Sequence, residues 1–88
     1  MKVTVSIPTP LRSYTAHNPE VEVEGRTLGE ALAAIDRRYP GLRFRIITEQ
    51  DTVRQHIKIF INGAQAGSLS DPLQSGDHLY IICALSGG

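Results

Sequence analysis

The sequence predicts an α+β fold in which a mixed β-sheet is covered on one face by one main helix. Segments near the N-terminus and in the second half alternate apolar and polar residues, which is the period of a half-buried strand. One segment, residues 28–39, repeats its apolar residues at helical spacing. The last apolar segment, residues 79–83, is typical of a strand in the middle of a sheet.

The first two strands are expected at residues 2–7 and 20–24. In the first, Val3, Val5 and Ile7 alternate with polar residues, and the prolines that follow cannot donate ladder hydrogen bonds. The second reads Glu-Val-Glu-Val-Glu, and this alternation places its carboxylates on a solvated face instead of in a metal or catalytic site. We expect the two strands to pair as a hairpin around a long polar connection.

The main helix is expected to begin after Thr27, because Glu30 follows three residues later in the arrangement of a capping box. Its apolar stripe consists of Leu28, Ala31, Leu32, Ile35 and Tyr39. The pair Pro40-Gly41 is a stop signal, so the helix should end just before it.

The second half of the chain contains shorter signals. Residues 42–46 alternate but are few, so they fit either a strand or an irregular packed segment. The isoleucines at 57, 59 and 61 predict a strand, and Asn62-Gly63 is a strong turn signal after it. At most a short strand is expected within residues 64–70. The apolar run at 79–83 then predicts a last strand that is covered on both faces.

Composition argues against several classes of function. Nine basic and nine acidic residues give a formal net charge of zero, which does not suit nucleic acid or an anionic membrane as the main partner. Cys83 is the single cysteine, so neither an internal disulfide nor a cysteine-based metal site is expected. Without a secretion signal or a long apolar run, the pattern predicts a cytoplasmic protein. The sequence also shows no self-contained catalytic constellation.

The C-terminus is the most informative feature of the chain. It reads Leu85-Ser86-Gly87-Gly88, and the two glycines leave the backbone without side chains. We expect a domain at residues 1–83 and a flexible tail at residues 84–88. Five extended residues reach roughly 17 Å. Ala84, Leu85, Ser86 and Gly87 would thus thread a narrow passage and present the Gly88 carboxylate to the active site of another protein.

Several motifs, taken in order, resemble one family. They are Leu11-Arg12, Tyr39-Pro40-Gly41-Leu42, Ile59-Phe60-Ile61-Asn62-Gly63, Ser75-Gly76-Asp77, the apolar last strand and Ser86-Gly87-Gly88. Together they are similar to the ThiS/MoaD group of ubiquitin-like sulfur carriers, over essentially the whole chain. The resemblance implies the β-grasp fold and the role of a protein cosubstrate instead of an enzyme. Many relatives carry prolines where this chain has Cys83-Ala84, which leaves the stiffness and partner preference of the tail open.

The resemblance also implies a reaction at Gly88. A ubiquitin-activating-type adenylyltransferase would use ATP and magnesium to adenylate the terminal carboxylate. A sulfur donor protein would then displace AMP and leave a thiocarboxylate, and the carrier itself would bind no cofactor. The acceptor would be the large subunit of molybdopterin synthase or a cysteine synthase homologue, both of which we place ahead of a thiamine route.

Two rival functions use the same features. A ubiquitin-like modifier would join Gly88 to lysine amines of target proteins, with nitrogen in place of sulfur as the nucleophile. A plain interaction module would use the folded domain without any chemistry at the tail.

The partner interface is expected around Ile82, Arg12 and Phe60. The resemblance implies that an apolar residue shortly before the glycine pair docks on the partner, and Ile82 holds that position. Alternation places Ile81 and Ile82 on opposite faces of the strand, and the sequence does not decide which is outside. Cys83 invites a persulfide role, but no basic residue is adjacent to it, so we interpret it as a small apolar residue.

Overall fold

The computed structural model describes residues 2–83, so the predicted tail at 84–88 lies outside the described residues. The elements in chain order are β1 (Lys2–Ser6), the 3-10 helix η1 (Thr9–Thr15), β2 (Glu20–Glu24), α1 (Leu28–Arg38), α2 (Leu42–Ile46), β3 (Ile57–Ile61), β4 (Ala64–Gln65) and β5 (His78–Cys83). Among these residues no helix is long and apolar enough to cross a membrane.

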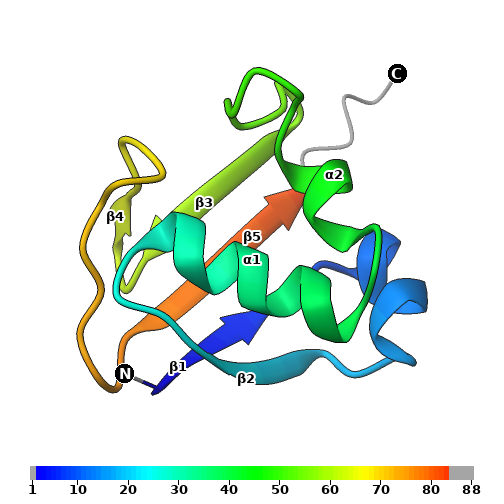
Figure 1. Cartoon of the computed structure of the whole chain (residues 1–88). Coiled ribbons are helices and arrows are strands. Elements are labelled where there is room, and N and C mark those ends of the chain that lie inside the picture. The colour runs from blue at the N-terminus through cyan, green and yellow to red at the C-terminus, as the bar shows by residue number, and fades with distance from the viewer. Residues whose placement is uncertain (1, 84–88) are drawn as a thin grey trace.

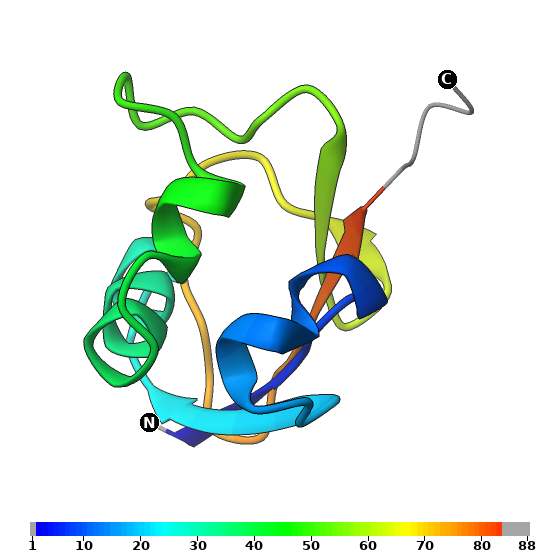
Figure 2. The ribbon, with the colours of Figure 1, turned by 90° about the vertical axis from the view of Figure 1, so that its right-hand side faces the viewer.

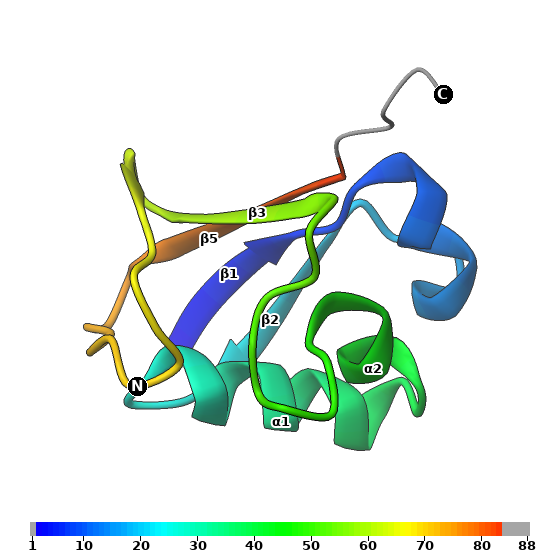
Figure 3. The same ribbon diagram turned by 90° about the horizontal axis from the view of Figure 1, so that it is seen from above.

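The strands form one mixed sheet of five strands in the order β2-β1-β5-β3-β4. Strand β5 lies at its centre, parallel to β1 on one side and antiparallel to β3 on the other. Both α1 and α2 lie on the same side of the sheet (Figure 1, Figure 3). The predicted α+β architecture and the central place of the last strand are therefore confirmed.

The β1–β2 hairpin follows the alternation of its valines. Val3 pairs with Val23 and Val5 with Val21, and all four side chains are buried. The glutamates of β2 point to solvent, as predicted. The wide connection contains η1, which the polar composition did not indicate. Thr15 is fully buried in it, because its hydroxyl is satisfied by donating to carbonyl oxygens of the same connection.

The capping box at the start of α1 is confirmed. The Thr27 hydroxyl accepts the Glu30 amide at 3.2 Å, as in a capping box, and the Glu30 carboxylate reaches back to accept the amide of Arg26, one residue before the N-cap, at 2.9 Å. The stripe that packs against the sheet consists of Leu28, Ala31, Leu32 and Ile35, all buried. The helix ends at Arg38, two residues before Pro40, as expected.

The expectation of a strand or an irregular segment at 42–46 was wrong, because these residues form the short helix α2. Leu42 and Ile46, four residues apart, are fully buried, whereas Phe44 between them is 52% exposed. This is helical spacing and not strand spacing. The Asp36 carboxylate of α1 accepts the amides of Gly41 and Arg43 at 3.1 Å each, and so binds the free amides where α2 begins.

The core fills the space between α1 and the inner face of the sheet. Its contributions from β5 are Leu79 and Ile81, at 0% and 3% exposed. The neighbouring side chains on the opposite face, Tyr80 and Ile82, are 40% and 47% exposed. The prediction that β5 is covered on both faces was therefore wrong, because no helix of residues 2–83 lies on the outer side of the sheet (Figure 3).

Gly25 sits where the chain passes closely under α1. A Cβ at this position would lie 2.7 Å from the Ala31 nitrogen and 3.0 Å from its Cα, and both are backbone atoms that cannot move aside. We expect Gly25→Ala to lower the free energy of unfolding by roughly 1–3 kcal/mol in urea denaturation. Gly63→Ala is the matched control, since its Cβ would meet nothing within 4 Å. Equal stability of the two variants would contradict this packing.

Asp71 organises the loop that covers the start of α1. Hydrogen bonds from the backbone amides of Gly67 and Ser68 hold the pKa of its carboxyl below the ordinary value of 3.8. Its backbone oxygen accepts the Leu28 amide at 3.0 Å, so this loop is tied to the helix.

A lowered pKa in the folded state means that ionised Asp71 contributes stability above pH 3.8, and that this contribution is lost as the pH falls through the lowered pKa. We expect Asp71→Ala to unfold at lower urea concentration than the wild type at neutral pH. The difference in urea midpoint between the wild type and Asp71→Ala should become smaller below pH 3.8. A difference that stays constant over this range would show that the carboxylate charge contributes nothing.

Candidate functional site

The sheet has one face that no helix of residues 2–83 covers, and this face extends to the end of β5 (Figure 3). We call it the outer sheet face. We define it by Lys58 and Phe60 of β3 and Tyr80 and Ile82 of β5. In the register of the two strands, Phe60 lies opposite Tyr80, and Lys58 lies opposite Ile82. Ile82 is exposed and Ile81 is buried, which answers the question that the sequence left open. An apolar side chain therefore stands on the surface next to Cys83, the last described residue.

Tyr80 is held in a fixed position on this face. Its ring stacks on His78, with 4.2 Å between centroids and 5° between planes. The His78 imidazole Nε2 is hydrogen-bonded to the Ser6 hydroxyl at 2.7 Å and lies 3.9 Å from a carboxylate oxygen of Glu20. Neither Tyr80 nor His78 was predicted as an interface residue, although both lie on the same face of the strand as Ile82.

Phe60 and Arg12, the other two predicted interface residues, occupy different places. Phe60 is half-buried on the outer sheet face, beside Tyr80. Arg12 belongs to η1 and not to the sheet, and its Nε donates to the Ile7 carbonyl at 2.9 Å. The structure thus brings Phe60, Tyr80 and Ile82 onto one face, while Arg12 secures the turn that follows β1.

Cys83, the last described residue, is half-buried opposite Ile57 and packs against the core. It has no basic neighbour in the sequence, but the fold brings Arg45, Arg54 and His56 around the same cleft. Figure 2 shows this end of the molecule, where η1, α2 and the end of β5 lie. Within residues 2–83, no group of His, Cys, Asp and Glu side chains is arranged to hold a metal ion.

The predicted reacting residue Gly88 and the predicted threading residues lie outside the described residues. The latter are Ala84, Leu85, Ser86 and Gly87. The structure establishes where the described chain ends, at Cys83 beside the outer sheet face.

A hairpin, a helix across the sheet and a central last strand parallel to the first define a ubiquitin-like β-grasp protein. The chain belongs to the ThiS family, whose model matches residues 5–88.

Relatives of known structure agree with this assignment. The sulfur carrier protein CysO of Mycobacterium tuberculosis is 32% identical, over the full length of both chains. A crystal structure of the Amycolatopsis orientalis BexX/CysO complex contains a chain 34% identical to this one. The two superpose with a TM-score of 0.90, and the match covers 98% of this chain and 99% of that chain. Small archaeal modifier protein 1 of Haloferax volcanii is 33% identical over 77% of this chain and 78% of its own. The protein therefore belongs with the sulfur carriers of this family.

Proposed function

We propose that the carboxylate of Gly88 carries the sulfur, as a thiocarboxylate formed by an activating enzyme. The observation that carries the proposal is the full-length match to sulfur carriers, which continues to Gly88 at the end of a Gly-Gly pair. Because neither glycine has a side chain, this end of the chain can enter an active site too narrow for other residues.

The chemistry explains why a second protein is needed. A terminal carboxylate is ionised at neutral pH and resists attack by a nucleophile. Its oxygen attacks the α-phosphorus of ATP and pyrophosphate leaves, which gives an acyl adenylate whose acyl carbon no longer carries a carboxylate charge. A sulfur nucleophile then forms the carbon–sulfur bond and AMP departs, so one difficult step becomes two easier ones. ATP and magnesium belong to the ubiquitin-activating-type adenylyltransferase in this scheme, and the carrier binds no cofactor.

The acceptor that we propose is a homologue of cysteine synthase, which would use the thiocarboxylate sulfur to make cysteine. The support is the similarity to proteins named sulfur carrier protein CysO, at 32–34% identity. The Amycolatopsis orientalis relative is found in a complex with BexX, which supports a partner-bound mode of action here as well. Delivery to the large subunit of molybdopterin synthase is the alternative within the same chemistry.

A protein modifier is the second candidate function, favoured by the match to small archaeal modifier protein 1. The same activated carboxyl of Gly88 would then react with a lysine amine and form an isopeptide bond.

An intact-mass measurement on protein purified from its own cells separates these functions. Replacement of one oxygen by sulfur supports the carrier, and branched conjugates through Gly88 support the modifier. Unmodified chain alone, in cells that are making cysteine from sulfide, would contradict both. The acceptor is then identified as the protein that copurifies with the sulfur-loaded form.

A further inference from the structure

A cleft of about 410 Å³ opens beside the end of β5, on the side away from the outer sheet face. We call it the tail-side cleft. Its apolar lining comes from three elements, and its polar lining consists of two arginines and a histidine; the residues are Leu11, Phe44 and Cys83, with Arg45, Arg54 and His56. No carboxylate of residues 2–83 lines it.

The two guanidinium groups of the cleft are held by aromatic rings and not by acids. Arg54 lies over the Phe44 ring at 4.5 Å, and its Nε donates to the Phe44 carbonyl at 2.6 Å. Arg45 lies over the Tyr14 ring at 5.7 Å. Neither arginine forms an ion pair with a carboxylate of the described chain. The terminal nitrogens of Arg54 therefore have no acidic partner within residues 2–83.

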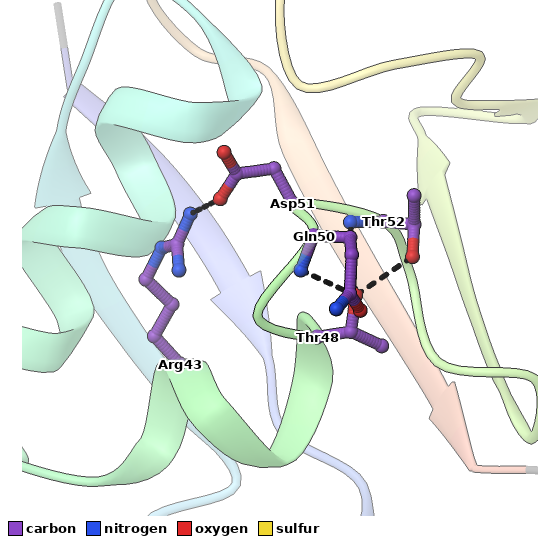
Figure 4. Close-up of polar contacts among 5 residues, drawn as sticks. All are labelled: Arg43, Thr48, Gln50, Asp51 and Thr52. Atoms are coloured by element: carbon purple, nitrogen blue, oxygen red, sulfur yellow. Dashed lines mark hydrogen bonds and ion pairs between the residues drawn. The ribbon is translucent and has the colours of Figure 1, made fainter.

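The loop that carries Arg54 is fixed by its own hydrogen bonds. The Thr48 hydroxyl contacts the Thr52 hydroxyl at 2.8 Å and accepts the Gln50 amide at 3.2 Å, while Asp51 is paired with Arg43 at 3.2 Å (Figure 4). Further along the same loop, the Arg54 amide donates to the Ile46 carbonyl of α2 at 2.9 Å. The loop thus holds Arg54 in place before any partner binds, and this lowers the entropic cost of binding.

Two arginines line the tail-side cleft although the chain as a whole carries no net charge. The three glutamates of β2 lie on the sheet edge, two strands away from β5. A second cleft, beyond Phe44, is lined by the acidic residues Asp36, Glu49 and Asp51 together with Arg43, which is paired with Asp51. A partner that contacts both the end of β5 and the tail-side cleft therefore meets the guanidinium groups of Arg45 and Arg54 next to apolar side chains.

We propose that the tail-side cleft binds a carboxylate side chain, with an adjoining apolar side chain, on the surface of the enzyme that activates Gly88. This inference rests on the proposed function. A free guanidinium fork suits a planar carboxylate, and the apolar floor suits a neighbouring aliphatic group. The position adds the second argument, because five extended tail residues reach only roughly 17 Å from Cys83. The surface that surrounds the enzyme's active site therefore lies close to the end of β5, which borders both this cleft and the outer sheet face.

The recognition chemistry can be measured with the carrier alone. We would titrate isotopically labelled protein with the peptide acetyl-Glu-Leu-Glu-amide, with acetyl-Gln-Leu-Gln-amide and with inorganic phosphate, all at one ionic strength. Only the acidic peptide should shift the NMR signals of Phe44, Arg45 and Arg54, and Arg45→Glu should remove the shifts. No saturable shift, equal shifts with the neutral peptide, or equal shifts with phosphate would overturn the proposal.

The role in activation is measured separately, as the rate of thiocarboxylate formation at Gly88 in extract from the protein's own cells with ATP, magnesium and sulfide. We expect Arg45→Glu to slow the rate about tenfold or more, since reversal of an interface charge acts on association. Arg54→Lys, which keeps the charge but loses the fork, should also slow it. Arg37→Glu, an exposed reversal on α1, is the matched control and should leave the rate unchanged.

Thermal unfolding of each variant shows whether the fold is retained. Loading of Arg45→Glu at the wild-type rate would overturn the role of the cleft and leave the proposed function standing. No loading of the wild type would contradict the proposed function instead, and the peptide titration would then decide on the cleft by itself.

Discussion

Replacing Gly87 with alanine should slow thiocarboxylate formation by about 100-fold, because a Cβ in a close-fitting passage displaces the reacting carbon of Gly88. Stability should not change, since residue 87 lies beyond the domain predicted at residues 1–83. The measurement is the initial rate of sulfur loading under saturating ATP, together with the urea midpoint of the same variant.

Gly63→Ala provides the matched control for this experiment. It makes the same chemical change at a turn where the new methyl group meets nothing within 4 Å. We expect it to load at the wild-type rate. Normal loading of Gly87→Ala would mean that the activating enzyme does not enclose the tail, and the argument from the bare glycine backbone would fail.

Truncation of Ile82 to alanine should slow sulfur loading about tenfold while leaving the fold intact. The side chain is 47% exposed next to Cys83, the last described residue, so it has apolar surface that a partner can bury. An anchor of this kind typically contributes more than about 1 kcal/mol to an interface. Removal of an exposed group should change the free energy of unfolding by no more than about 0.5 kcal/mol.

Truncation of the adjacent residue, Ile81, should reduce stability instead of binding. Ile81 is 3% exposed within the core, so Ile81→Ala should lower the free energy of unfolding by about 2–5 kcal/mol. Two identical truncations, one residue apart, thus separate binding from stability. If Ile82→Ala loaded as fast as the wild type, the outer sheet face would not be the docking surface.

The sequence predicted those elements whose signals are local and periodic. The hairpin, the capping box of Thr27 and Glu30, the stripe of α1 and the central β5 all follow from alternation, helical spacing or a cap. The short helix α2 was missed because Leu42, Phe44 and Ile46 also alternate. Only the amide contacts of Asp36 and the exposure of Phe44 distinguish the helix from a strand.

The site residues show the same difference between local signals in the sequence and features that only the fold creates. The parity of β5 limited the exposed apolar residue to Ile81 or Ile82, and the packing of α1 on the inner face decided in favour of Ile82. The tail-side cleft could not be read from the sequence. Arg45 belongs to α2, whereas Arg54 and His56 belong to the loop before β3, and only the fold brings them around Cys83. The chemistry of Gly88 came from the terminus itself and from the family resemblance.

The most direct test of the central claim is the mass of the C-terminal tryptic fragment of protein taken from its own cells. The last lysine or arginine in the sequence is Lys58, so this fragment spans residues 59–88 and contains Gly88 and Cys83 but not Met1, whose oxidation would confuse an intact mass. We predict a fragment in which sulfur replaces one oxygen, with fragmentation placing the change at Gly88 in both the wild type and Cys83→Ser. Sulfur found only at Cys83 and lost in Cys83→Ser would contradict the account.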